Sequence, residues 1–233
     1  MRCSPDRPNG NVIDLFTGKP LLEAQRERII RLSPELDGLE MLYANDTDKQ
    51  KLFSLKILCW ALRENGEVVG LVPWLNKVIA CPAINDPLNG KFEGYYDPGL
   101  EEIFFDPPIH KIVELESAAE YYESSADSPD AVVQEIPDTI GTHAVLSERG
   151  SHSMTLSEVV SWQLHYDGQL SGMLVDPDKV ASTPVLPGDD CLFAAETCPI
   201  FRYYFQHQIA NKIKSQDPEA IAAISALVDE SSS

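Results

Sequence analysis

The chain has few basic residues, and it lacks the short motifs that identify most enzymes. Its 233 residues include 18 lysines and arginines against 37 aspartates and glutamates, which gives a formal net charge of −19. Such a charge repels phosphate backbones, so we expect no direct binding to nucleic acid. The sequence contains no nucleophile elbow, phosphate-binding loop or dinucleotide fingerprint. No residue is therefore assigned to catalysis, and no cofactor is expected.

Long apolar runs and paired cysteines are missing as well. No stretch reaches the roughly 18 apolar residues of a membrane helix, and the first residues show neither the apolar core nor the cleavage site of a secretory signal. The five cysteines include no CxxC pair, which is typical of reduced thiols in a cytosol. Cys191, Cys198 and His207 lack zinc-site spacing, and no EF-hand spacing is present. We expect a cytoplasmic protein without membrane association and without a bound metal.

The negative charge is concentrated in one part of the chain. Residues 98–138 carry 1 basic and 11 acidic side chains, a net −10 that is more than half of the total. A surface of this kind attracts cationic protein surfaces, although it can also serve only to keep the protein soluble.

Two stretches of the chain, residues 57–84 and 159–186, align with each other without a gap. Seven of the 28 aligned positions are identical, against about two expected by chance. Each stretch contains a two-residue turn, Asn65-Gly66 in one and Asp167-Gly168 in the other, which favours a β-hairpin. The identical pairs are Trp60/Trp162, Leu62/Leu164, Gly66/Gly168, Gly70/Gly172, Lys77/Lys179, Val78/Val180 and Pro82/Pro184.

Apolar residues at helical spacing, together with serine, aspartate and proline at helix starts, predict several helices. They fall in residues 21–32, 34–43, 107–122, 199–213 and 217–228. A third strand is predicted in each half, at residues 103–104 and 192–193. The predicted fold class is α+β: two pseudo-repeated halves of three antiparallel strands plus a helix, with extra N-terminal and C-terminal helices. Residues 1–16 are predicted to be a flexible extension. Residues 17–233 are predicted to form a single domain of two halves, 17–124 and 139–233, joined by an acidic connection.

The candidate binding residues lie where the two copies differ. The first copy carries an apparent insertion, NDPLNGKFEGYYD, whose Phe92, Tyr95, Tyr96 and Asp97 are predicted to bind a partner or, alternatively, to cover a sheet edge. Glu116, Glu120 and Glu123 fall on one side of the helix predicted after Pro107 and form the second candidate group.

Two functions from different classes follow. The first is a non-catalytic binding or regulatory protein that recognises a basic protein partner through the acidic face and the aromatic insertion loop. The alternative is a hydrolase, with or without a divalent metal, whose carboxylates meet in a cleft between the halves; Glu101, Glu102, Asp189 and Asp190 are its candidates. Mimicry of nucleic acid by the acidic surface is a third possibility.

Overall fold

β-Branched and aromatic residues recur along the described chain, and more than half of it forms strands. The structure is a computed structural model that describes residues 27–44, 52–86, 90–119, 128–148, 153–176, 178–179 and 191–206. Of these residues, 55% lie in strands and 11% in helical turns, with one α-helix, α2 (Ile109–Ala119). The α+β fold class, with a helix in each half and further helices at both ends, is therefore wrong. The fold is mainly antiparallel β-sheet.

The strands form three antiparallel sheets. The first has the order β1 (Ile29–Pro34), β4 (Cys59–Arg63), β5 (Val68–Trp74), β6 (Lys77–Ala80). The second has the order β14 (Leu192–Ala194), β13 (Leu170–Val175), β12 (Thr155–His165), β11 (His143–Leu146), β15 (Phe201–Phe205), with β10 (Val132–Pro137) beside β12. The third has the order β3 (Leu52–Lys56), β2 (Glu40–Ala44), β8 (Gly90–Asp97), β7 (Asn85–Asp86), with β9 (Glu102–Phe104) on β8.

Both hairpins of the sequence repeat are present, and their registers agree. Trp60 in β4 lies opposite Gly70 in β5, and Trp162 in β12 lies opposite Gly172 in β13. The correspondence extends to strands outside the aligned stretches. Strands β1 and β10 flank the tryptophan strands, while β2 pairs with β8 as β11 pairs with β15. Strand β12 corresponds to two strands of the first half. Its first part pairs with β11, as β3 pairs with β2, and its second part pairs with β10 and β13, as β4 pairs with β1 and β5.

The sequence alignment fails after the second strand of each hairpin. Strands β5 and β6 are joined by Leu75 and Asn76, whereas residues 176–191 separate β13 from its partner β14. Ala80 of β6 and Ala194 of β14 occupy matching places, opposite Leu71 and Met173. By this register Lys77, Val78 and Pro82 match Cys191, Leu192 and Glu196. Of the residues aligned with them in the sequence, Val180 and Pro184 lie outside the described residues. The extra residues at this point belong to the second half.

The helix predicted over residues 34–43 is replaced by the end of β1, a turn and β2. Ser-Pro-Glu is typical of a helix start, but the Glu35 carboxylate accepts the backbone N–H groups of Asp37 (2.5 Å) and Leu39 (3.3 Å). A side chain that binds nearby backbone groups competes with helix formation, and Gly38 completes the turn with φ of 79°. Residues 29–32 of the preceding predicted helix are in β1, and its first part lies outside the described residues.

The helix predicted after Pro199 is also wrong where the structure describes it. Phe201, Tyr204 and Phe205 match a helical spacing, yet residues 201–205 form β15, which pairs with β11. Aromatic residues fit a half-buried sheet surface well, and a five-residue segment is too short to distinguish the two periods. The helix predicted over 217–228 lies outside the described residues. The helix predicted after Pro107 is present as α2.

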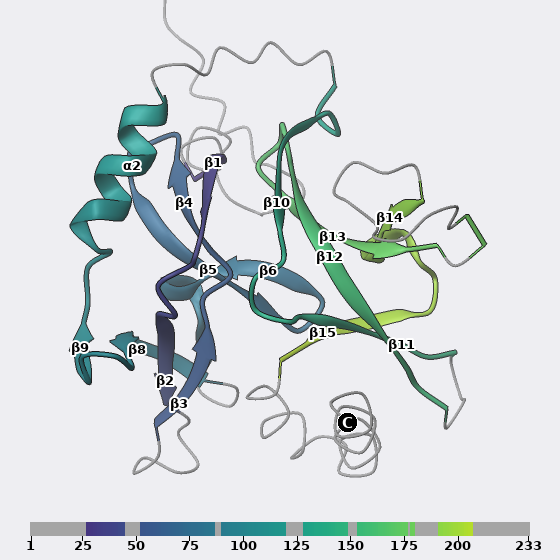
Figure 1. The fold of residues 1–233 in the computed structure, drawn as a ribbon, viewed down its shortest axis with the longest axis horizontal. Helices are drawn as coiled ribbons and strands as arrows, with labels where there is room; N and C mark the ends of the chain where they lie inside the picture. Colours follow the sequence, from purple (N-terminus) through teal and green to yellow (C-terminus); the bar gives the residue numbers. More distant parts are fainter. Residues whose placement is uncertain are drawn as a thin grey trace, which may run out of the picture.

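The two halves share their hydrophobic core. One cluster joins Val145 and Phe205 to residues of the first half, and the other packs Leu58 and Leu71 with Trp162 and residues around it. The Gln134 side-chain amide binds both the N–H and the carbonyl of Leu32, each at 2.8 Å, and so bridges β10 and β1. Figure 1 shows β10, β12 and β13 beside the first sheet.

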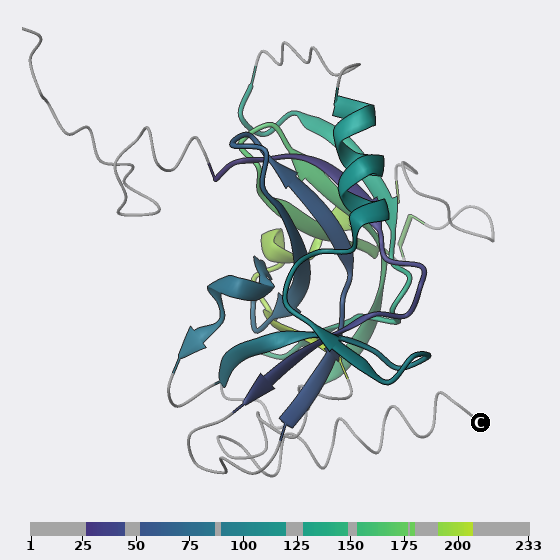
Figure 2. The ribbon, with the colours of Figure 1, turned by 90° about the vertical axis from the view of Figure 1, so that its left-hand side faces the viewer.

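Helix α2 lies on the outer side of the first half, against β1 and β4 (Figure 1). Figure 2 faces this side of the molecule, with α2 above strands β2 and β3. Lys111 anchors the helix, because its ammonium donates to the carbonyl of Pro34 at 3.3 Å while the residue is only 5% exposed. Among the described residues, no helix has the length and apolar character needed to cross a membrane.

Candidate functional site

Each half contains the same unit of tryptophan, glycine and tyrosine. In the first half the Gly70 N–H donates to Tyr95 Oη at 3.2 Å, and the Trp60 and Tyr95 rings lie 5.0 Å apart. In the second half the Gly172 N–H donates to Tyr204 Oη at 3.0 Å, and the rings of Trp162 and Tyr204 lie 4.8 Å apart. A tyrosine ring covers each glycine, so that a Cβ would meet the tyrosine side chain at 2.7 Å at Gly172 and at 3.0 Å at Gly70.

Each unit is completed by a carboxylate that follows a proline. Trp60 Nε1 donates to Glu35 at 2.5 Å, and Trp162 Nε1 donates to Asp138 at 2.9 Å. Asp138 also accepts the N–H groups of Gly141 and Thr142, which repeats the turn built by Glu35. Neither acid was predicted from the sequence to have a role. A sequence pattern could have identified them, because Pro34-Glu35 and Pro137-Asp138 are each followed three residues later by a glycine, Gly38 and Gly141. Both glycines have positive φ in the structure.

The two units differ at the 3₁₀ turn that follows β6 or β14. This turn is η1 (Cys81–Ala83) in the first half and η2 (Ala195–Thr197) in the second. The Tyr204 hydroxyl donates to the Glu196 carboxylate in a short hydrogen bond. Glu196 is exposed as a residue, but its carboxyl end loses hydration beside Tyr204, and this burial raises its pKa. At the matching position the first half has Pro82, whose side chain offers no acceptor.

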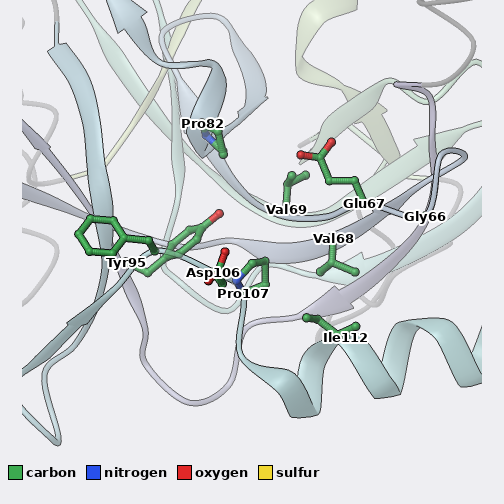
Figure 3. Close-up of a pocket in the computed structure, with 10 residues that line it drawn as sticks. Gly66, Glu67, Val68, Val69, Pro82, Tyr95, Asp106, Pro107 and Ile112 are labelled. Atoms are coloured by element: carbon green, nitrogen blue, oxygen red, sulfur yellow. The ribbon is translucent and has the colours of Figure 1, made fainter.

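A pocket of about 300 Å³ lies beside Tyr95 in the first half. Its walls come from the β4–β5 hairpin, from η1 and from the segment that leads into α2 (Figure 3). The Tyr95 hydroxyl points toward the middle of this view. Burial raises the pKa of Tyr95, so the phenol stays protonated. The lining residues are Gly66, Glu67, Val68, Val69, Pro82, Tyr95, Phe105, Asp106, Pro107 and Ile112.

Residues 100–116, which we call the acidic–apolar segment, form an unusual part of the surface. They contain five of the eight large apolar side chains that are exposed in the described residues: Leu100, Ile103, Phe105, Ile109 and Val113. The same segment carries five carboxylates and a single lysine, Lys111, which is buried. Among the described residues, no cation pairs with Glu101, Glu102, Asp106 or Glu116. The segment thus presents apolar groups and uncompensated negative charge together.

The predicted aromatic insertion is not a loop, because residues 85–86 and 90–97 form β7 and β8. Tyr95 is 1% exposed and belongs to the core, while Phe92 packs on it with ring centroids 5.1 Å apart. Tyr96 and Asp97 are partly exposed and pair with β9. Glu116 is exposed on α2, whereas Glu120 and Glu123 lie outside the described residues. Binding through any of these residues stays a prediction.

The carboxylates predicted for a hydrolase are only partly described. Glu101 lies exposed in the turn between β8 and β9, and Glu102 is the exposed first residue of β9. Asp189 and Asp190 lie outside the described residues. In the part of the chain that the structure describes, no three His, Cys, Asp or Glu side chains lie close enough to hold a metal. Burial raises the thiol pKa of Cys59 and Cys81, which keeps both in the unreactive protonated form.

The fold and the paired units define a class: a β-sheet protein built from an internal repeat, with one surface that is both acidic and apolar. Comparison of the chain with protein-family models, with curated proteins and with solved structures gives no match. Function has to be argued from the repeat, the pocket and the acidic–apolar segment themselves.

Proposed function

We propose that this protein is a non-catalytic binding protein that recognises a basic protein partner through the acidic–apolar segment. The observation that carries the proposal is the coincidence, within residues 100–116, of exposed apolar side chains and carboxylates that no described cation neutralises. Exposed large apolar side chains that gather in one segment are more typical of interaction surfaces than of ordinary monomer surfaces.

The electrostatics of the segment support a cationic partner. Lys111, its one lysine, points inward to the Pro34 carbonyl and lies 3.6 Å from Asp37. His110 also contacts Asp37, at 3.1 Å. The outward charge is therefore negative. Charges of this kind steer a cationic partner and set its orientation, while burial of the exposed Ile103, Phe105 and Ile109 side chains supplies affinity.

The remaining predicted residues extend the same surface. Tyr96 pairs with Ile103, and Asp97 with Glu102, across the β8–β9 ladder, so both adjoin the acidic–apolar segment. Glu116 lies at its C-terminal end on α2. We include Tyr96, Asp97 and Glu116 in the proposed interface, together with Phe92 as a supporting residue.

Charge reversal tests this proposal. The double variant E102K/E116K should lose about tenfold or more in affinity for a cationic protein captured from an extract of the source cells, purified and measured by titration calorimetry. The matched control E148K/E158K reverses two exposed charges in the second half and should bind as the unmodified chain does. Raised salt should weaken binding of the unmodified chain. Binding that survives both E102K/E116K and raised salt would remove the acidic–apolar segment from the interface.

A further inference from the structure

The pocket beside Tyr95 is lined by Pro82, and the residue at the corresponding position of the other half, Glu196, binds the Tyr204 hydroxyl. The two 3₁₀ turns match in detail, since Cys81 and Ala195 are fully buried and their carbonyls accept the N–H groups of Ile84 (3.1 Å) and Cys198 (3.0 Å). Pro82 therefore stands at the position of Glu196. One half carries its own hydrogen-bond acceptor at this position, and the other half has an open pocket.

The open pocket contains a polar group that lacks a partner. The Tyr95 hydroxyl accepts the Gly70 N–H, but its own proton has no acceptor among the described residues, although the residue is only 1% exposed. Buried hydroxyl groups are nearly always satisfied as donors. In the second half the equivalent proton goes to Glu196. The first half needs an acceptor from outside the described chain.

The lining of the pocket decides the kind of acceptor. Glu67 is paired with Arg63 at 2.6 Å, and Asp106 has no cationic partner among the described residues. A ligand carboxylate would meet this negative charge, so a neutral carbonyl oxygen is favoured, next to a cationic group. Val68, Val69 and Ile112 offer an apolar wall to the rest of the ligand.

We propose that the pocket beside Tyr95 binds a short peptide segment with basic and apolar side chains. A main-chain carbonyl of the peptide accepts the Tyr95 hydroxyl proton, a lysine or arginine faces Asp106, and an apolar side chain packs on Val68 and Ile112. The peptide takes the place that Glu196 holds in the second half. This inference rests on the proposed function, because it assigns the peptide to the basic partner.

The experiment uses the full chain, isotope-labelled for amide spectra, and the probe peptide acetyl-Leu-Arg-amide. We expect a saturable shift of the Gly70 amide, which is bound to the Tyr95 oxygen, and no shift of the Gly172 amide. Acetyl-Leu-Glu-amide has the same carbonyls with the opposite charge and should bind several-fold more weakly.

Two variants test whether the Tyr95 hydroxyl and the open space are both needed. P82E supplies the first half with the carboxylate of the second, and Y95F removes the hydroxyl. Each should weaken peptide binding about fivefold or more, as expected for one lost hydrogen bond and a filled pocket. The matched control Y204F removes the same hydroxyl from the second half and should leave peptide binding unchanged. Amide dispersion verifies folding, and if P82E does not fold, the comparison of Y95F with Y204F decides.

Two results would overturn the inference: a Gly70 amide that does not respond to the arginine peptide, or peptide binding by P82E and Y95F that is as strong as binding by the unmodified chain. Failure here is separate from failure of the proposed function. If the peptide does not bind but E102K/E116K still abolishes partner binding, only the peptide site is excluded. If the peptide binds but E102K/E116K does not change partner binding, the acidic–apolar segment is excluded from the interface and the peptide site is still supported.

Discussion

The two halves of this chain build the same core unit but finish it differently. In both, a tryptophan donates to a carboxylate, and a tyrosine covers a glycine and accepts its N–H. The second half closes the unit with Glu196, which accepts the Tyr204 hydroxyl. The first half has Pro82 and a pocket there, and it continues into the acidic–apolar segment. Features that both halves share maintain the fold, and the features found in one half only are the candidates for function.

The largest expected effect comes from removing the indole N–H of each unit. W60F leaves the Glu35 carboxylate, which is 4% exposed, without its 2.5 Å donor, and it shrinks a fully buried side chain. We expect a loss of about 3 kcal/mol in unfolding free energy. W162F should cost less, about 2 kcal/mol, because Asp138 is only partly buried and can be hydrated. Urea denaturation followed by circular dichroism measures both. Equal losses of unfolding free energy in W60F and W162F would contradict the expectation that the burial of the acid sets the size of the effect.

Glycine substitution tests the contact with each tyrosine. A Cβ at Gly172 would lie 2.7 Å from Tyr204 Oη, whereas a Cβ at Gly70 would lie 3.0 Å from Tyr95 Cε1. G172A should therefore lower stability more, by about 2 kcal/mol against about 1 for G70A, as is usual for overpacking. Thermal unfolding in a calorimeter can rank the two. Because Tyr95 borders the pocket, its ring is expected to shift more easily than that of Tyr204. A larger loss of stability in G70A than in G172A would contradict this expectation.

The seam between the halves is tested at Gln134. Q134L leaves the N–H and the carbonyl of Leu32 without their 2.8 Å partners, at a residue that is 3% exposed, and should cost about 2 kcal/mol. Q163L is the control, because it loses one 3.2 Å bond to Glu135 inside the second half. We expect a single unfolding transition in both variants, which would support the predicted single domain. Two transitions in Q134L, seen by tryptophan fluorescence, would contradict it.

The smallest effect concerns pH. Burial raises the pKa of Glu196 above its ordinary value of 4.5, so the folded state holds this proton more tightly than the unfolded state does. The resulting stabilisation is complete below the ordinary value and is lost as pH rises through the raised one. The difference in unfolding free energy between the unmodified chain and E196Q should change by a fraction of a kcal/mol over that window, because the residue is largely exposed. A difference that stays flat would argue that Glu196 is hydrated.

Particular residues show how far the sequence could be interpreted. The Asn65-Gly66 and Asp167-Gly168 turns identified both hairpins, because their conformation is fixed by neighbouring residues. Ser33-Pro34-Glu35 pointed to a helix, and only the indole of Trp60, distant in sequence, commits Glu35 to a turn. Tyr95 was predicted to be a binding residue from its loop-like surroundings, and it lies in the core because Gly70 leaves space for its ring. The sequence alone did not single out Pro82. Its position became informative only when the structure matched it with Glu196 in the second half.

Four features could be predicted from the sequence: the duplication, the two hairpins, the helix after Pro107 and the concentration of acidic charge. Each of these depends on turn chemistry, capping or composition within a short stretch of chain. The tertiary structure alone decided that residues 34–43 and 201–205 are strands, that β8 corresponds to β15, and that a pocket lies beside Tyr95. Those outcomes depend on contacts between residues far apart in the chain, where long-range pairing and burial outweigh the weak local preference for helix.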